Sequence, residues 1–267
     1  MKTDLSHIIS RCFVNIPFAD FARYEDFVSR YRINPEIGLD GDILYTATRK
    51  DFLARARFLR ERDLQCTLHA PFHDMLPGAA DRVILAATRK KLKRCFDLIK
   101  IFKPRSIVCH LGYLDCVHGY DLERWLATSL ETWRHLLIVA AEQEVEVMFE
   151  NTYEQGPAVH RVLLDALDSP FAGFCLDTGH ILAFAGTPLH EWLEILGDRL
   201  RQLHLHDNHG GRDEHLPLGK GDFDFPGLFS SLAARAIRPI ITLEPRSEED
   251  LWESLIALDR FSIFDHK

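Results

Sequence analysis

Short apolar runs alternate with longer segments of helical periodicity along almost the whole chain. The apolar runs are bounded by turn residues, which is typical of strands buried on both faces. We predict eight strands, in residues 12–17, 33–39, 66–72, 106–112, 146–152 and 173–180, in a stretch that begins at 203, and in 239–245. Helical patterns follow the strands, among them residues 46–62, 79–102, 122–143, a short helix from 157, 188–196 and 248–258.

This alternation predicts parallel strands joined by crossover helices. With 267 residues, the chain has the length of one α/β barrel. We therefore predict an α/β fold, a single (β/α)8 TIM barrel that spans residues 1–267 as one domain. A doubly wound open sheet is the competing fold, but no glycine-rich phosphate loop follows the first strand.

Polar residues stand at the end of each later strand, where a barrel would bring them to one mouth. A buried charge at such a position is costly without a partner. A lone histidine there is more often a packing residue, but so many strand ends in sequence favour a divalent-metal site over that interpretation. These residues are His69, His110, Glu150, Asp177 with His180, His204, then Asp213 and His215 in the following loop, and finally Glu244.

Composition narrows the choice of partners. The formal net charge is -8 and the isoelectric point is about 5.9, so a surface built to hold nucleic acid is not expected. The basic run from Arg89 to Arg94 is expected to be the solvated face of an outer helix. No apolar run is long enough for a membrane span, and the polar N-terminus does not resemble a signal peptide. The six cysteines lack paired spacing, which favours reduced core residues and a cytoplasmic location.

The motifs HAPF, HLG, FEN, LDTGH, HLHDN with DEHLPLGKGDFDF, and LEP resemble the xylose isomerase-like TIM barrel superfamily between about Thr67 and Pro245. That superfamily includes sugar isomerases and epimerases together with endonuclease IV. In the isomerase and epimerase branch, the resemblance implies one divalent metal held by Glu150, Asp177, His204 and Glu244. The two glutamates would also act as acid and base, and His180 would bind or polarise substrate oxygens.

The resemblance to endonuclease IV implies three zinc ions and a different chemistry. His69, His110 and Glu150 would hold one zinc, the four residues of the single-metal site a second, and His180, Asp213 and His215 a third. The N-terminal stretch RCFVNIPFAD and the loop LHAPFHDMLPG depart from that branch, and the chain is acidic. A zinc phosphodiesterase or AP endonuclease, a related metal-dependent dehydratase, and a barrel that binds without turnover therefore remain alternatives.

We accordingly predict an enzyme of carbohydrate metabolism, a metal-dependent isomerase or epimerase of a sugar or sugar phosphate. It would transfer a proton through a metal-bound enediolate. The expected cofactor is one zinc, manganese or cobalt ion, although the ligand set allows up to three. The expected partner is a small sugar, and a homo-oligomer is left open by the sequence. Candidate substrate-binding residues are His69, His110, His206, Arg212, Lys220 and Arg246.

Overall fold

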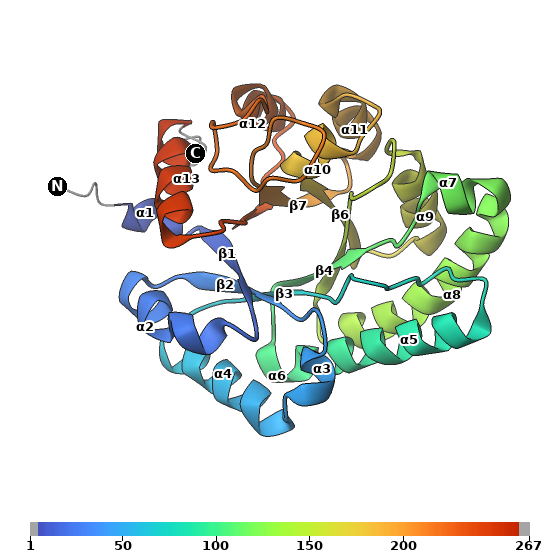
Figure 1. The fold of residues 1–267 in the computed structure, drawn as a ribbon, viewed down its shortest axis with the longest axis horizontal. Coiled ribbons are helices and arrows are strands. Elements are labelled where there is room, and N and C mark those ends of the chain that lie inside the picture. The colour runs from blue at the N-terminus through green and yellow to red at the C-terminus, as the bar shows by residue number, and fades with distance from the viewer. Residues whose placement is uncertain (1–4, 262–267) are drawn as a thin grey trace.

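The computed structural model describes residues 5–261, in which eight parallel strands close into a barrel (Figure 1). Each strand pairs with the next in the sequence, and β1 pairs with β8, as in Phe13 opposite Thr242. The predicted TIM barrel is therefore confirmed, while the predicted single domain over 1–267 includes terminal residues outside the described range. The strands are β1 Cys12–Pro17, β2 Asn34–Gly38, β3 Thr67–His69, β4 Ser106–His110, β5 Glu146–Glu150, β6 Ala172–Asp177, β7 Leu200–Leu205 and β8 Ile240–Leu243.

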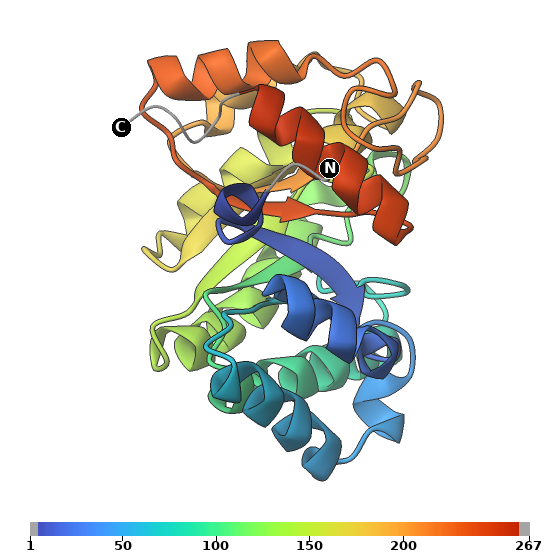
Figure 2. The ribbon, with the colours of Figure 1, turned by 90° about the vertical axis from the view of Figure 1, so that its left-hand side faces the viewer.

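Helices surround the barrel on its outer side, as Figure 1 shows. The closing helix α13 contacts the first helix α1, and Figure 2 shows the two beside β1. No helix within residues 5–261 is long and apolar enough to cross a membrane. The helices are α1 Ser6–Ile9, α2 Phe21–Tyr31, α3 Ile43–Thr46, α4 Arg49–Glu61, α5 Arg82–Asp97, α6 Ile99–Phe102, α7 Asp115–His118, the 3-10 helix η1 Gly119–Asp121, α8 Leu122–Ala141, α9 Ala158–Leu167, α10 Thr178–Ala183, α11 Leu189–Leu196, α12 Phe225–Ala234 and α13 Glu248–Arg260.

The sixth predicted strand differs from the observed one. The observed strand β6 ends at Asp177, whereas the sequence predicted that it would extend to His180. The difference arises because the Asp177 side chain caps a new helix, α10. Oδ1 of Asp177 accepts a hydrogen bond from the backbone N–H of His180 at 2.7 Å. His180 therefore projects from the first turn of a helix. The long helix predicted over 79–102 is likewise divided, into α5 and α6.

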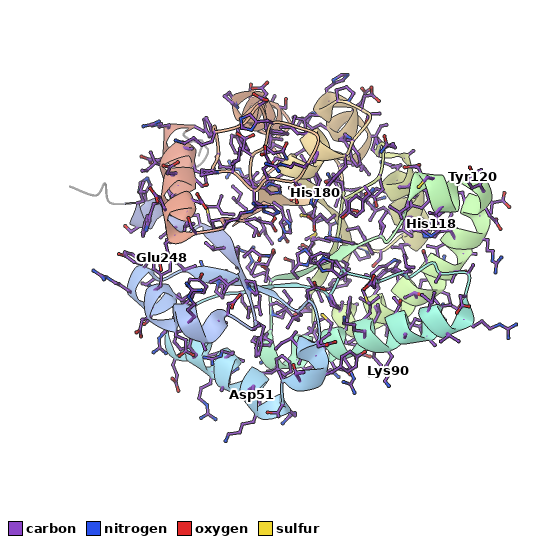
Figure 3. All side chains as sticks on the ribbon, viewed as in Figure 1. Asp51, Lys90, His118, Tyr120, His180 and Glu248 are labelled. Carbon is purple, nitrogen blue, oxygen red and sulfur yellow. The ribbon has the colours of Figure 1, made fainter. Side chains whose placement is uncertain are left out.

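The basic run on α5 lies on the outside, as the sequence predicts. Lys90 and Lys93 are exposed, Arg89 pairs with Glu131 of α8 at 3.0 Å, and Lys93 pairs with Asp97 at 2.8 Å. Figure 3 shows Lys90 at the periphery of the molecule, whereas His180 lies inside the ring of helices. Five of the six cysteines are buried, and burial raises the pKa of Cys66 to about 12; Cys116 alone is exposed.

Candidate metal centre

The C-terminal ends of the strands surround a cavity of about 670 Å³. Eight of the predicted site residues line it: His69, His110, Glu150, His180, Asp213, His215, Glu244 and Arg246. Asp177 and His204 lie directly beneath and are completely buried. A larger cavity of about 950 Å³ lies at the opposite end of the barrel, beside Asn34 and Gln65, and none of the predicted site residues lines it. The chemistry therefore belongs to the smaller cavity, at the end where barrels of this kind carry their active sites.

Glu150, at the end of β5, is the centre of the cluster. Its Oε2 lies 2.9 Å from Nε2 of His110 and 3.1 Å from Nε2 of His69. Its Oε1 lies 3.1 Å from Nδ1 of His204. A carboxylate that faces three imidazole nitrogens in a buried place is suited to bridging cations.

A second group of side chains lies beside Glu150, around Asp177 and Asp213. Oδ1 of Asp177 is 3.1 Å from Nε2 of His206, and Oδ2 of Asp213 is 2.9 Å from Nε2 of His215 and 3.5 Å from Nε2 of His180. The rings of His206 and His215 stack with their centroids 4.0 Å apart. All of the metal-ligand candidates predicted from the sequence are therefore brought together.

The histidine rings are held in the orientation that metal ligands need. Nδ1 of His69 lies 2.9 Å from the carbonyl oxygen of Ala70, Nδ1 of His180 lies 2.8 Å from that of Asn151, and Nδ1 of His215 lies 3.3 Å from that of Glu244. A carbonyl can only accept, so each Nδ1 carries a proton, and Nε2 is the ring nitrogen that faces the carboxylates and could bind a cation between them. This is the usual arrangement around a protein metal site.

Two buried polar atoms in the cluster have no hydrogen-bond partner among the described residues. They are Nδ1 of His206 and Oδ1 of Asp213, which lie 3.5 Å apart. Unpartnered buried polar atoms are costly, and a cation would satisfy both atoms. Five sets of three residues bring ligand atoms within 4.8 Å of one another, and they include the set Glu150, Asp177 and His204. The donor set thus fits one to three divalent ions.

The two glutamates at the mouth have different electrostatic surroundings. Burial alone would raise the pKa of Glu150, but His204 and His110 hold that pKa well below its ordinary value. Burial raises the pKa of Glu244, and His204 only partly opposes this effect. Burial also favours the neutral form of His215, but Asp213 and Glu244 raise the pKa of His215 to about 9.

Of the three cationic side chains predicted to bind substrate, one lines the cavity and two do not. Arg246 lines the cavity and donates to the backbone carbonyl of Asp213 at 3.3 Å. Arg212 lies outside the cavity, with 81 % of its side chain exposed and Glu214 at 3.0 Å. Lys220 also lies outside it and pairs with Glu253 at 3.1 Å. Neither lines this cavity.

His206 lies in the floor of the site rather than along the cavity wall. It is 1 % exposed, and a Cβ at Gly179 would collide with its ring, which explains the glycine of the DTGH motif. Sequence reasoning overlooked Glu36, a completely buried carboxylate on β2 that lies 3.1 Å from Nε2 of His204. The signal available was a charged residue in the middle of an apolar strand, NPEIG.

Together, a closed parallel barrel and a histidine–carboxylate cluster at its C-terminal mouth define an α/β barrel with a candidate metal centre. The chain belongs to the xylose isomerase-like TIM barrel family, whose model matches residues 36–260. This confirms the family that the motifs indicated.

The proteins that this chain resembles include an uncharacterized protein, a probable endonuclease and an epimerase-like protein. It is 27 % identical over 220 residues to an uncharacterized protein of Methanocaldococcus jannaschii, covering 81 % of this chain and 83 % of the relative. It is 28 % identical over 210 residues to a probable endonuclease 4 of Mycobacterium leprae, covering 73 % and 80 %. Among solved structures, it resembles a D-tagatose 3-epimerase-like protein with a TM-score of 0.80 and 18 % identity, covering 94 % and 96 % of the two chains.

Proposed function

We propose that this protein is a divalent-metal-dependent sugar epimerase or isomerase that moves a proton between substrate carbons. The observation that carries the proposal is the placement of Glu150 and Glu244. Both line the cavity, and Oε1 of each lies 3.1 Å from Nδ1 of His204. Two carboxylates that face one cavity can remove a carbon-bound proton and return one.

The metal would be held by Glu150, Asp177, His204 and Glu244. When bound, a divalent ion supplies Lewis acidity that stabilises negative charge on substrate oxygens. His180 lines the cavity with its Nδ1 fixed by a backbone carbonyl, so its Nε2 can orient a hydroxyl or carbonyl of the sugar. His69 and His110 would hold Glu150 in place and contact the substrate from the opposite wall.

The relatives support this reading at the level of fold. The structural neighbours include the D-tagatose 3-epimerase-like protein and a D-psicose 3-epimerase studied with D-fructose, which has a TM-score of 0.75 at 12 % identity. The cavity itself favours a small polar substrate, because histidines, carboxylates and Asn15 line it together with Phe72, Tyr153 and Phe184. Aromatic faces beside polar groups suit the mixed surface of a sugar.

Solvent-isotope incorporation tests this proposal directly. The protein, loaded with manganese, cobalt or zinc in turn, would be incubated with a panel of ketoses in deuterium oxide. Proton transfer through Glu150 and Glu244 should place deuterium on the carbon beside the carbonyl, which NMR detects even when the net conversion is small. The absence of both deuterium incorporation and a new sugar across the panel, with every metal, would contradict the proposal.

A multinuclear zinc phosphodiesterase is the second candidate. The observation that favours it is that His69, His110, His180, Asp213 and His215 all join the cluster, beyond what a single ion requires. A structural neighbour from Thermus thermophilus, solved after soaking with zinc chloride, matches with a TM-score of 0.79 and 24 % identity. Elemental analysis of protein purified without added metal or chelator separates the candidates. About one ion per chain favours the epimerase, whereas three zinc ions together with cleavage of abasic DNA or phosphate diesters would favour the hydrolase.

A further inference from the structure

Glu36 occupies an unusual place for a carboxylate, inside the barrel and below the candidate metal centre. It lies on β2, is completely buried, and is surrounded by side chains from four other strands. Its Oε2 accepts hydrogen bonds from Gln202 at 2.8 Å, Thr67 at 3.0 Å and Thr242 at 3.2 Å. Its Oε1 accepts one from Asn15 at 3.2 Å. The carboxylate is thus held in one orientation by groups that only donate to it.

The orientation of Gln202 is fixed in turn by Ser106. The Ser106 hydroxyl donates to Oε1 of Gln202 at 2.6 Å, so the amide nitrogen of Gln202 must face Glu36. The remaining neighbour of Glu36 is Nε2 of His204, which lies 3.1 Å from Oε1 and 3.3 Å from Oε2. An ionised carboxylate can only accept, so Nε2 of His204 must carry the proton that it donates.

This contact has a direct consequence for the other ring nitrogen. Nδ1 of His204 lies 3.1 Å from both Glu150 and Glu244, the two carboxylates of the mouth. We propose that Glu36 is a positioning residue: it keeps a proton on Nε2 of His204, so that Nδ1, which faces Glu150 and Glu244, is the ring nitrogen that gives up its proton to bind a divalent cation. This inference rests on the metal site of the proposed function.

His204 differs in this respect from three other histidines of the cluster. In His69, His180 and His215, a backbone carbonyl accepts from Nδ1 and leaves Nε2 for the cluster. In His204 a side chain accepts from Nε2, so the ring presents Nδ1 instead. A side-chain partner can be changed by mutation, which makes the role of Glu36 testable.

Glu36→Gln keeps the shape of the side chain and changes its hydrogen-bonding pattern. The glutamine oxygen should take the Oε2 position, where the donors converge, and its NH₂ group would then lie at the Oε1 position, 3.1 Å from Nε2 of His204. With a neutral amide oxygen in place of the carboxylate and an amide donor beside it, Nε2 would hold its proton less firmly, and the proton could move to Nδ1, where it blocks the cation. We expect the affinity for Zn²⁺, measured by competition with a chelator, to fall about 10- to 100-fold.

Thr67→Val is the matched control, because it removes one donor from the same carboxylate but leaves the contact with His204 intact. It should lower the thermal unfolding temperature while Zn²⁺ affinity stays within about threefold of wild type. Glu36→Gln that binds Zn²⁺ as tightly as wild type would overturn the inference. Failure of the wild-type protein to bind any divalent ion would instead overturn both this inference and the proposed function.

A measurement on the wild-type protein covers the case in which Glu36→Gln does not fold. In Zn²⁺-loaded protein labelled with ¹⁵N-histidine, the His204 ring should show a proton on Nε2 and none on Nδ1. Zinc on Nε2, with the proton on Nδ1, would contradict the role of Glu36 whatever the catalytic activity.

Discussion

Two completely buried histidines, His204 and His160, have opposite electrostatic surroundings. His204 projects into the barrel among Glu36, Glu150 and Glu244. His160, on α9 outside the barrel, packs against Phe174 and Trp192 and donates from Nε2 to the backbone carbonyl of Glu150 at 3.1 Å. Burial lowers the pKa of both rings, but the nearby acidic groups reverse this effect for His204, whereas the pKa of His160 falls to about 4.

The comparison shows that residue type and burial alone do not identify a functional histidine. What distinguishes the two is the number of carboxylates within hydrogen-bond distance, three for His204 and none for His160 among the contacts of the described residues. The interior of the barrel brings these carboxylates around His204, whereas His160 packs against aromatic rings between the barrel and its helical layer. We expect substitutions around His204 to lower catalytic activity, and substitution of His160 to change the stability of the fold.

The largest effect is expected from the carboxylates of the mouth. Glu150→Gln or Glu244→Gln should lower kcat/KM by about 1,000-fold or more, because each change removes a metal ligand and a candidate acid or base. Steady-state kinetics on the sugar that shows deuterium incorporation measures this effect. Glu146→Gln, at the other end of the same strand β5 and paired with Arg201, is the control and should leave kcat/KM unchanged. Retention of more than a few per cent of activity in either variant would contradict the assigned roles.

A smaller effect is expected from the histidines on the β3 and β4 side of the mouth. For an enzyme with one metal, His69→Ala or His110→Ala should raise KM about 10-fold, through loss of a buried hydrogen bond, and leave one ion per chain. His135→Ala, on the outer helix α8 with an exposed side chain that does not line the cavity, is the control. A metal content that falls from three ions to two in either variant would instead indicate the multinuclear centre.

Most of the fold and much of the site could be predicted because both depend on local pattern. Apolar runs that end in His, Asp or Glu place those residues at one mouth once the barrel is inferred. The position of His180 on a helix could not be read in this way, because Asp177 caps that helix with the same carboxylate that the site needs. Strand and helix signals overlap at this point.

The buried position of Glu36 below the site and that of His206 in its floor could not be predicted for a different reason, because both depend on partners far away in the sequence. Glu36 meets Gln202 and Thr242, which lie 166 and 206 residues away in the sequence. His206 belongs to the floor only because Gly179 leaves room for its ring. Neither relation produces a periodicity or a motif, so the three-dimensional arrangement was needed.

His160, the buried histidine outside the barrel, predicts a pH effect on the stability of the fold. His160 stays neutral in the folded protein down to about pH 4, whereas in the unfolded chain it binds a proton below about pH 6.5. The unfolded state therefore gains protons first as the pH falls, and stability is lost between about pH 6.5 and 4, by about 2 kcal/mol at pH 5. His160→Gln keeps a donor but cannot titrate, so its free energy of unfolding in urea should fall less steeply over this range. Equal slopes for the two proteins would show that His160 does not contribute.

The smallest effect is expected at the rim. Arg246 is the one Arg or Lys side chain that lines the cavity among residues 5–261, and it is exposed and bonded to a backbone carbonyl. An exposed guanidinium contributes little to binding a neutral sugar, so Arg246→Ala should raise KM by less than about threefold. Arg212→Ala, outside the cavity, is the control and should have no effect. If KM for Arg246→Ala rises about 50-fold or more, the substrate must carry an anionic group such as a phosphate, because only a charge-assisted bond would be worth that much. Arg246 thus decides between a sugar and a sugar phosphate, a choice that the buried cluster leaves open because its histidines and carboxylates suit either substrate.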